Sequence, residues 1–202
     1  MGTDHHEGLD GFDSALRRLA GESPARARSA GVVKLTRVPT PLGAMIVGAT
    51  DDALRLLEFA DPEAVEEQLR RVRKQLDAFI VPGETDVTRR TADELASYFA
   101  GELREFSVPL EAGGTAFQEA VWAELRMIPY GTTRSYGEQA RRIGRPEAVR
   151  AVARANGDNP IAIIIPCHRV IGADGTLTGY GGGLWRKKRL LELEQGVVGL
   201  GL

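Results

Sequence analysis

Cysteine is almost absent from this sequence, with a single Cys among 202 residues. One thiol cannot form a disulfide framework, and it cannot build a zinc site made mainly of thiolates. No run of 18 apolar residues occurs, and the opening MGTDHHEGLD lacks the basic and then apolar pattern of a signal peptide. The sequence therefore predicts a soluble, cytoplasmic protein with a reduced thiol and no membrane partner.

A large net charge is also lacking, because 26 Lys and Arg stand against 28 Asp and Glu, which gives −2. The two parts of the chain nevertheless differ. Residues 1–120 hold 14 basic and 21 acidic side chains, a net charge of −7, whereas residues 121–202 hold 12 and 7, a net charge of +5. Such an asymmetry indicates a polyanionic partner for the second part of the chain.

Composition also suggests how the chain is divided. Residues 1–30 have little apolar content and predict a flexible N-terminal tail with one short helix within 9–21. His5 and His6 lack further ligand candidates nearby, so we expect no metal site there. The stretch VPLEAGGT at 108–115 is the expected boundary between an N-terminal α+β domain at 31–108 and a second domain at 114–195.

The first domain begins with a β-like pattern. Short apolar segments at 32–38, 44–50 and 53–59, separated by turn residues, predict an antiparallel meander. Helical spacing of apolar residues follows at 62–79. A further helix is expected to begin at Thr91, because Glu94 three residues later completes a capping-box pattern.

The second domain reads as mainly helical. A capping-box pattern at 115–118 opens a helix that Pro129 ends, and two short helices follow at about 135–143 and 147–155, with Pro146 in the first turn of the latter. Two helices joined by a short turn form a helix-turn-helix candidate. The run IAIII at 161–165 predicts a buried strand, and 185–194 predicts a last helix.

The helix-turn-helix candidate is rich in arginine, with six Arg and two Glu between Arg134 and Arg154. Arg150 and Arg154 share one helix face at a spacing of four residues. Such a face suits phosphates or bases of DNA. An ordinary solvated helix pair has the same pattern, so both interpretations stay open at this point.

The single cysteine lies in Pro166-Cys167-His168-Arg169. A lone cysteine is often only a small buried apolar residue. Here an adjacent His could take its proton, the Arg169 cation is expected to lower the thiol pKa, and Glu194 is a candidate to orient the imidazole. Neighbours on an extended strand point to opposite faces, so the pair needs a turn here.

A glycine-rich segment, GYGGGLW at 179–185, follows. Glycines let backbone approach a ligand closely, and Tyr180 could stack on a planar base, although a flexible connector would look the same. Together these segments resemble the O6-alkylguanine-DNA alkyltransferase family. The resemblance rests on PCHRV at 166–170, Asn159-Pro160, TAFQEAVWAELRMIPYGTTRSYGEQA at 115–140, and GYGGGL. It is dense over 115–194 and looser over 40–110.

The resemblance implies an α+β fold, in which a small ribonuclease-H-like α/β domain precedes a mainly helical domain containing the helix-turn-helix. Cys167 would accept the alkyl group from guanine O6 once and keep it as a thioether. His168 would act as the base through a water, Glu194 would orient it, and Asn159 would tie the site together. No metal and no cofactor are implied.

The same resemblance implies a DNA-binding surface and a base pocket. The partner would be double-stranded DNA carrying O6-alkylguanine, bound by a monomer, with assembly along DNA left open. Arg150 would enter the duplex in place of the flipped nucleotide, and Tyr136 would crowd the adjacent phosphate and protonate the leaving guanine. Arg134 and Arg154 complete the DNA-binding residues. The base pocket is expected to comprise Val170, Leu177, Thr178, Gly179 and Tyr180.

The sequence departs from the family pattern in two respects, and two other functions remain as alternatives. Gly157-Asp158 stand where many relatives carry a basic residue, and the zinc ligands that some relatives have near the N-terminus are lacking. A non-enzymatic helix-turn-helix regulator or damage sensor would share most features, although such sensors replace the cysteine that is present here. A cysteine hydrolase would have Cys, His and Glu but no obvious oxyanion-binding device.

Overall fold

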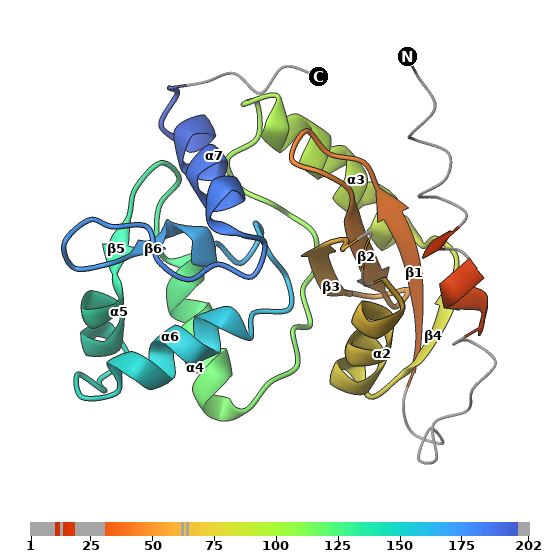
Figure 1. The fold of residues 1–202 in the computed structure, drawn as a ribbon, viewed down its shortest axis with the longest axis horizontal. Coiled ribbons are helices and arrows are strands. Elements are labelled where there is room, and N and C mark those ends of the chain that lie inside the picture. Colours follow the sequence, from red (N-terminus) through yellow and green to blue (C-terminus); the bar gives the residue numbers. More distant parts are fainter. Residues whose placement is uncertain (1–10, 13, 19–30, 62, 64, 198–202) are drawn as a thin grey trace. The chain divides into compact units, whose positions relative to one another are not determined.

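The structure is a computed structural model that describes residues 11–12, 14–18, 31–61, 63 and 65–197 (Figure 1). Residues 11–12 and 14–18 are helical, in agreement with the short helix expected within 9–21. The rest of the expected tail, with His5 and His6, lies outside the described residues.

Two compact units divide the chain. The first comprises residues up to 39 with 43–92 and 108–111, and the second comprises 40–42, 93–107 and the residues from 112 onward. Residues 93–107 thus group with the second unit. The sequence-based domain limits of 31–108 and 114–195 stay predictions.

A four-stranded sheet in the order β3-β2-β1-β4 forms the first unit. The antiparallel pairs of β1 (Val32–Val38) with β2 (Met45–Ala49), and of β2 with β3 (Leu54–Phe59), confirm the expected meander. The sequence missed β4 (Phe79–Pro82), which runs parallel to β1. The helix expected at 62–79 is therefore shorter, as α2 (Val65–Leu76), and the positive φ of 45° at Asp77 ends it.

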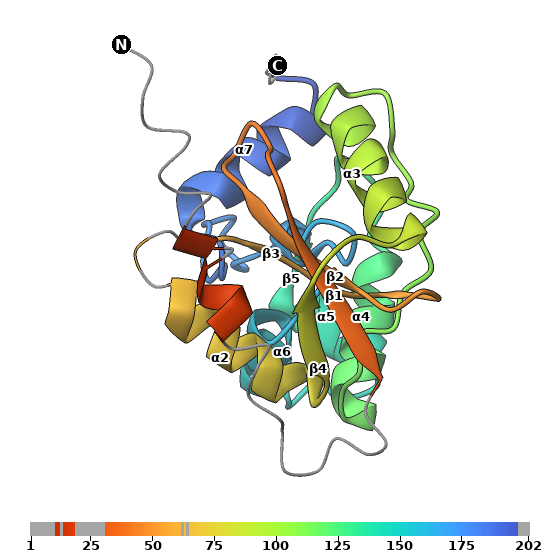
Figure 2. The same ribbon diagram turned by 90° about the vertical axis from the view of Figure 1, so that its right-hand side faces the viewer.

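One face of this sheet is covered by α2 and by the short N-terminal helix. The sheet lies between α2 on this face and the beginning of α3 on the other (Figure 2). Burying apolar side chains between helix and strands is the main stabilising contribution of such a layer. The buried cluster comprises Phe12, Ala15, Leu16, Val33, Leu35, Ile46, Leu56, Leu69, Val72, Leu76, Ala78 and Ile80.

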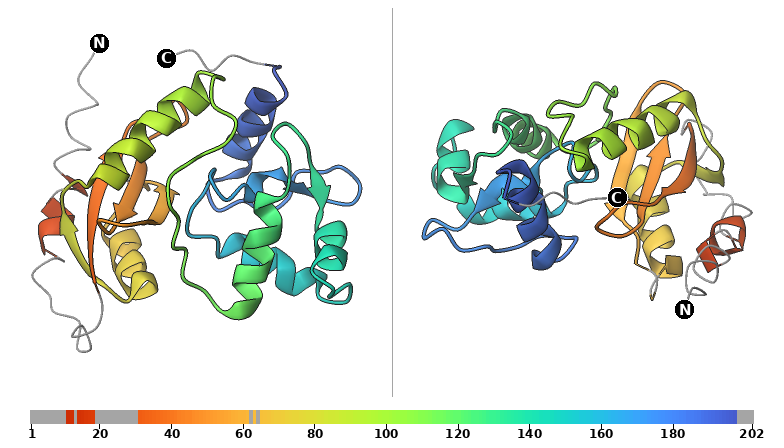
Figure 3. Two further views of the ribbon diagram at one scale, coloured as in Figure 1. Left: turned by 180° about the vertical axis from the view of Figure 1, so that it is seen from behind. Right: turned by 90° about the horizontal axis from the view of Figure 1, so that it is seen from above.

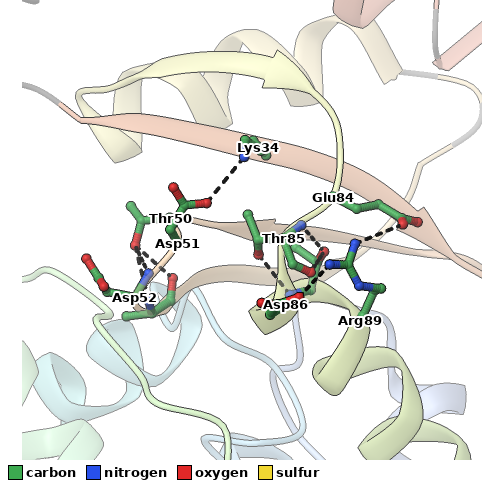
Figure 4. A network of polar contacts seen from close by, with 10 residues as sticks. Lys34, Thr50, Asp51, Asp52, Glu84, Thr85, Asp86 and Arg89 are labelled. Carbon is green, nitrogen blue, oxygen red and sulfur yellow. Dashed lines mark hydrogen bonds and ion pairs between the residues drawn. The ribbon is translucent and has the colours of Figure 1, made fainter.

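The expected helix start at Thr91 is wrong, because α3 spans Asp86–Phe99. Thr85, which immediately precedes this helix, is labelled in Figure 4. Thr85 and Thr88 close the first turn, because each donates its backbone N–H to the other's Oγ1, at 2.9 and 3.1 Å. Thr91 instead lies inside the helix, where its hydroxyl donates to the Val87 carbonyl at 2.7 Å. Reciprocal side-chain capping satisfies the free N–H groups of a first turn, and two threonines achieve it here without a Glu.

The second unit is mainly helical. It contains α4 (Ala116–Arg126), α5 (Tyr136–Arg142), α6 (Val149–Gly157) and α7 (Leu184–Glu194), and β5 (Arg134–Ser135) pairs parallel with β6 (Val170–Ile171). Helices α4, α5 and α6 lie side by side (Figure 3). Thr115 and Gln118 form the expected capping box. None of the described helices is long and apolar enough to span a membrane.

Two local expectations in this unit are wrong. Pro146 lies in the turn before α6, which begins at Val149, and not in the first helical turn. The run 161–165 is buried as expected but forms turns and no strand, because Ile163 has a positive φ of 70° and Ile165 N–H donates to the Ile161 carbonyl at 3.0 Å. An apolar run predicts burial, but it does not by itself distinguish a strand from a compact buried turn.

Candidate active site

The buried turn at 161–165 is followed by a short 3-10 helix, η1 (Cys167–Arg169), and Cys167 is its first residue. Arg169 N–H donates to the Pro166 carbonyl at 3.0 Å, which closes this turn. The turn that the sequence required between Cys167 and His168 is therefore present. It lets two adjacent side chains take part in one site, which an extended strand would not allow.

Asn159 holds the cysteine in place. Its Nδ2 lies 3.3 Å from Cys167 Sγ and 2.8 Å from the Ile165 carbonyl, while its Oδ1 accepts from Ile161 N–H at 3.0 Å. One amide side chain thus connects the Cys167 sulfur to both ends of the buried turn. The role of Asn159 in tying the site together stays a prediction, and these contacts support it.

The pKa of the Cys167 thiol differs from the expectation. Although Cys167 is partly exposed as a residue, burial of its thiol raises the pKa, and the Asn159 hydrogen bond and the Lys187 charge oppose this effect without reversing it. Arg169, which was expected to lower the thiol pKa, is instead paired with Glu194. The thiol is therefore protonated at neutral pH, and a nucleophilic role requires a base to take its proton.

His168 is the candidate for that base. Its imidazole is fully buried, and Nε2 lies 2.8 Å from Glu194 Oε1. Burial lowers the His168 pKa, and the Glu194 carboxylate only partly offsets this effect, so the ring is neutral at pH 7. Because the carboxylate can only accept, Nε2 carries the proton and Nδ1 is the acceptor. Nδ1 is buried and has no hydrogen-bond partner among the described residues.

Glu194 is the most heavily hydrogen-bonded group of the site. Burial alone would raise its pKa, but the hydrogen bonds from His168 and Arg169 and the positive charge of the Arg169 guanidinium hold the pKa well below its usual range. Arg169 binds it through two nitrogens, at 2.8 and 2.9 Å, which is the strong bidentate geometry of a guanidinium and a carboxylate. Gly131 N–H and the Tyr98 hydroxyl also donate to it, at 3.1 and 2.8 Å.

The predicted base pocket is held by a lysine that the sequence reasoning missed. Lys187 is fully buried on α7, and its Nζ donates to the carbonyls of Val170, Thr178 and Gly179 at 2.5, 2.6 and 3.3 Å. Burial lowers the Lys187 pKa to about 8. A cation that binds three carbonyls fixes the backbone of the pocket segment on which it acts. The pattern of leucines in α7 gave no sign of this role.

The aromatic residues of the predicted pocket lie close to the same segment. The Tyr136 hydroxyl donates to the Thr178 carbonyl at 3.2 Å. The Tyr180 ring meets the His168 ring edge-on, with centroids 6.5 Å apart, and its buried hydroxyl has no partner among the described residues. Leu177 is partly buried in the loop between β6 and α7. A buried hydroxyl without a hydrogen-bond partner in the protein, such as that of Tyr180, is available to bond a ligand.

The helix-turn-helix carries the predicted DNA-binding arginines unequally. Arg150 and Arg154 on α6 are exposed, and no ion pair of either occurs within the described part of the chain. Arg134 is instead largely buried in an ion pair with Glu124, which also pairs with Arg142. The structure therefore leaves Arg150 and Arg154 accessible to a partner, whereas Arg134 stabilises the unit itself.

Buried polar contacts hold this helix pair together. Gln139 of α5 and Asn156 of α6 exchange two amide hydrogen bonds, at 2.7 and 3.2 Å, and Gln139 also donates to the Val121 carbonyl. Trp122 Nε1 donates to the Ala155 carbonyl at 2.8 Å. No group of three or more His, Cys, Asp or Glu that could hold a metal ion occurs among the residues that the structure describes.

Known proteins resemble this chain in sequence and in structure. The family described as 6-O-methylguanine DNA methyltransferase, DNA binding domain, matches residues 116–196. A methylated-DNA–protein-cysteine methyltransferase of Mycobacterium tuberculosis is 67% identical over 103 residues, which are 51% of this chain and 62% of the relative. The match thus spans less than two thirds of that relative. A methyltransferase of the same name from Mycolicibacterium paratuberculosis is 51% identical over 72% of this chain and 89% of its own length.

Solved structures agree with these sequence matches. The crystal structure of the M. tuberculosis O6-methylguanine methyltransferase has 46% identity and a TM-score of 0.67, and covers 82% of this chain and 94% of its own. A structure of M. tuberculosis OGT in complex with DNA has 45% identity and a TM-score of 0.70, with the same coverage of both chains. The mixed α+β fold expected from the sequence is shared with these proteins. The chain therefore belongs to the family of methylated-DNA–protein-cysteine methyltransferases.

Proposed function

We propose that this chain repairs DNA by moving an alkyl group from O6 of guanine to Cys167, once per molecule. The observation that carries the proposal is the arrangement around His168. Glu194 occupies Nε2 of the imidazole, so Nδ1 is the free acceptor, and the cysteine next to it has a protonated thiol that needs a base. The related proteins are named methylated-DNA–protein-cysteine methyltransferases, which is the reaction proposed here.

The reaction follows from these groups. A water accepts the Cys167 proton and passes one to His168 Nδ1, and Glu194 stabilises the imidazolium that forms. The thiolate attacks the alkyl carbon, so that the S–C bond forms as the C–O6 bond breaks. Guanine leaves with the electron pair of the broken bond, and the Tyr136 hydroxyl supplies its proton. The thioether has no easy route back to a thiolate, so each molecule reacts once.

The substrate base must first leave the duplex, because O6 is buried in the base pair. Arg150 fills the space of the flipped nucleotide, and Arg154 contacts a phosphate. The exposed guanidinium groups of both residues on α6 support these roles. The pocket that receives the base is formed by Val170, Leu177, Thr178, Gly179 and Tyr180. Damage arises in any sequence, so phosphate contacts and groove shape dominate over base-edge recognition.

The proposal extends to partners and place. Double-stranded DNA with O6-alkylguanine is the partner, and the protein acts as a monomer without a metal or cofactor. A cytoplasmic location keeps the acceptor thiol reduced, as one transfer per molecule requires.

Mass spectrometry tests this function. After incubation with a duplex that contains O6-methylguanine, the intact mass of the protein should rise by one methylene unit, and peptide mapping should place it at Cys167. Cys167→Ala should bind the same duplex and leave the lesion unrepaired. An unchanged mass of the wild-type protein after complete incubation, with DNA binding intact, would instead identify a non-enzymatic damage sensor.

A further inference from the structure

Tyr98 is a buried residue in contact with the candidate site that no sequence motif indicated. It lies in the last turn of α3 and is fully buried, and its hydroxyl donates to Glu194 Oε1 at 2.8 Å across 96 residues of sequence. The phenol ring is fixed by three aromatic neighbours, Phe99, Phe106 and Tyr130, with centroids 5.3, 5.4 and 6.1 Å away. A ring held this way gives the hydroxyl a defined position.

The groups that donate hydrogen bonds to the Glu194 carboxylate affect it in different ways. Oε2 accepts from Arg169 Nε and Gly131 N–H, and Oε1 accepts from Arg169 Nη2, His168 Nε2 and the Tyr98 hydroxyl. Arg169 neutralises the charge, and His168 is the group that is oriented. Tyr98 is the donor on Oε1 that neither carries a charge nor changes protonation at neutral pH, because burial and the nearby Glu194 raise its pKa well above the usual value. It therefore constrains the direction of Oε1 throughout the reaction.

We propose that Tyr98 is a positioning residue for alkyl transfer, because its hydroxyl holds Glu194 Oε1 at the angle from which the carboxylate orients His168. The proposal rests on the proposed role of His168 as the base. Residues 93–107, which precede the stretch most similar to known relatives, then contribute to the reactive centre. Tyr98 and Glu194 belong to the same compact unit, which agrees with this assignment.

Loss of the hydroxyl has two separable effects. Without this donor Glu194 is less constrained, so His168 is aligned less often and the maximal transfer rate falls. A carboxylate with one donor fewer is also more basic, so it stabilises the imidazolium more strongly and raises the His168 pKa. The acid limb of the rate profile then moves to higher pH. The other charged groups that act on this pair are Arg169 and Lys187, and the titratable groups close to it are Cys167, Tyr130 and Tyr180, whose pKa values are all raised so that they are neutral at pH 7. Tyr98→Phe changes none of these groups.

The test compares Tyr98→Phe with Tyr130→Phe, which keeps the ring that packs on Tyr98 and removes a hydroxyl that is neutral between pH 5 and 8 because its pKa is raised. Both variants remove one hydroxyl from a packed ring, but only the Tyr98 hydroxyl makes a hydrogen bond to Glu194. Single-turnover transfer from free O6-methylguanine base is measured from pH 5 to 8, which avoids any effect on DNA binding. We expect the plateau rate of Tyr98→Phe to fall about tenfold, the loss typical of a hydrogen bond to a charged group. Its acid limb should move to higher pH, and Tyr130→Phe should match the wild type on both counts.

Two results would overturn the proposal. One is a Tyr98→Phe profile that coincides with the wild type, and the other is a lower plateau with an unmoved acid limb, which means that the hydroxyl only stabilises the fold. NMR titration of His168 gives the shift directly, even where the variant reacts too slowly to follow. If the wild-type protein itself gains no methylene unit, the proposed function fails, whereas wild-type transfer with an unaltered Tyr98→Phe rejects this role alone.

A double-mutant cycle adds a second check. If Tyr98 acts through Glu194, Tyr98→Phe should slow the wild-type protein but have no further effect in a Glu194→Gln background. Multiplied losses in the double variant would show that the tyrosine acts by another route and would contradict the proposal.

Discussion

His168 Nε2 and Glu194 Oε1 lie 2.8 Å apart, and both side chains are completely buried. The pair combines two opposing effects, since burial lowers the His168 pKa and the carboxylate raises it, with burial the larger. The imidazole therefore stays neutral at pH 7 and fixed in one tautomer. In the proposed mechanism this neutral imidazole takes the proton of the Cys167 thiol during the reaction, so no permanent thiolate is needed.

This arrangement predicts how transfer depends on pH. The rate from free O6-methylguanine base should be constant near pH 7 and fall as the pH drops through the folded His168 pKa, which lies below 6.5. Glu194→Gln removes the group that stabilises the imidazolium, so the rate at pH 7 should fall roughly 100-fold. Single-turnover rates between pH 5 and 8 measure both effects, and a rate that rises on acidification below 6.5 would contradict them.

The same pair makes stability depend on pH. The folded His168 pKa is depressed, so below about 6.5 the unfolded chain binds a proton that the folded chain does not, and the free energy of unfolding falls with falling pH. Glu194, also depressed, adds a further loss below about 4.5. Urea unfolding at pH 7.5, 6.5 and 5.5 measures the first effect. His168→Asn should weaken the dependence between 7.5 and 5.5, and an unaltered slope in that variant would exclude His168 as its source.

The sequence predicted Cys167, His168 and Glu194 as site residues but not the groups that contact them. Cys167 and His168 stand in the motif PCHRV, the family resemblance indicated Glu194, and local signals such as the Thr115 capping box and the 32–59 meander depend on neighbours in sequence. Tyr98 meets Glu194 across 96 residues, and no local pattern encodes such a contact. Arg169 was assigned to the thiol because it is adjacent in sequence, whereas the fold pairs it with the carboxylate. Strand β4 was missed because Phe79, its first residue, continues the apolar spacing of α2, so the expected helix extended to 79.

Gly131 is expected to be essential for the position of Glu194. Its φ is 75°, a Cβ there would lie 2.8 Å from the Glu194 backbone carbonyl oxygen, and its N–H donates to Oε2. Gly131→Ala should therefore cost at least about 3 kcal/mol of unfolding free energy and slow transfer from the free base.

Gly144 is the matched control, since its φ is 72° and no atom lies within 4 Å of the position that an added Cβ would take. Gly144→Ala should lose only about 1–2 kcal/mol. Equal losses in urea unfolding would show that backbone strain alone accounts for the effect.

The amide pair of Gln139 and Asn156 should stabilise the helix pair as a unit. Both side chains are buried, so Gln139→Leu leaves the Asn156 amide without its partner and should cost about 1–3 kcal/mol. Asn156→Leu should behave in the same way. Because replacing both partners removes the unsatisfied group, the double variant should lose less than the sum of the single losses. Thermal or urea unfolding of the four proteins decides this, and simple additivity would show that the two amides act independently.

Arg150 and Arg154 should affect the reaction on DNA in different ways, although both are exposed on α6. If Arg150 replaces the flipped nucleotide, Arg150→Ala should slow transfer from a duplex while leaving transfer from free O6-methylguanine base unchanged. If Arg154 contacts a phosphate, Arg154→Ala should weaken duplex binding at every sequence and reduce the slope of log K against log salt by about 1.

Binding titrations between 50 and 200 mM salt, paired with single-turnover rates on both substrates, separate the two roles. Arg70→Ala on the exposed face of α2 serves as the control for loss of one positive charge. An Arg150→Ala variant that loses activity equally on duplex and free base would place that arginine in the structural support of α6, because only a role in base flipping depends on the duplex.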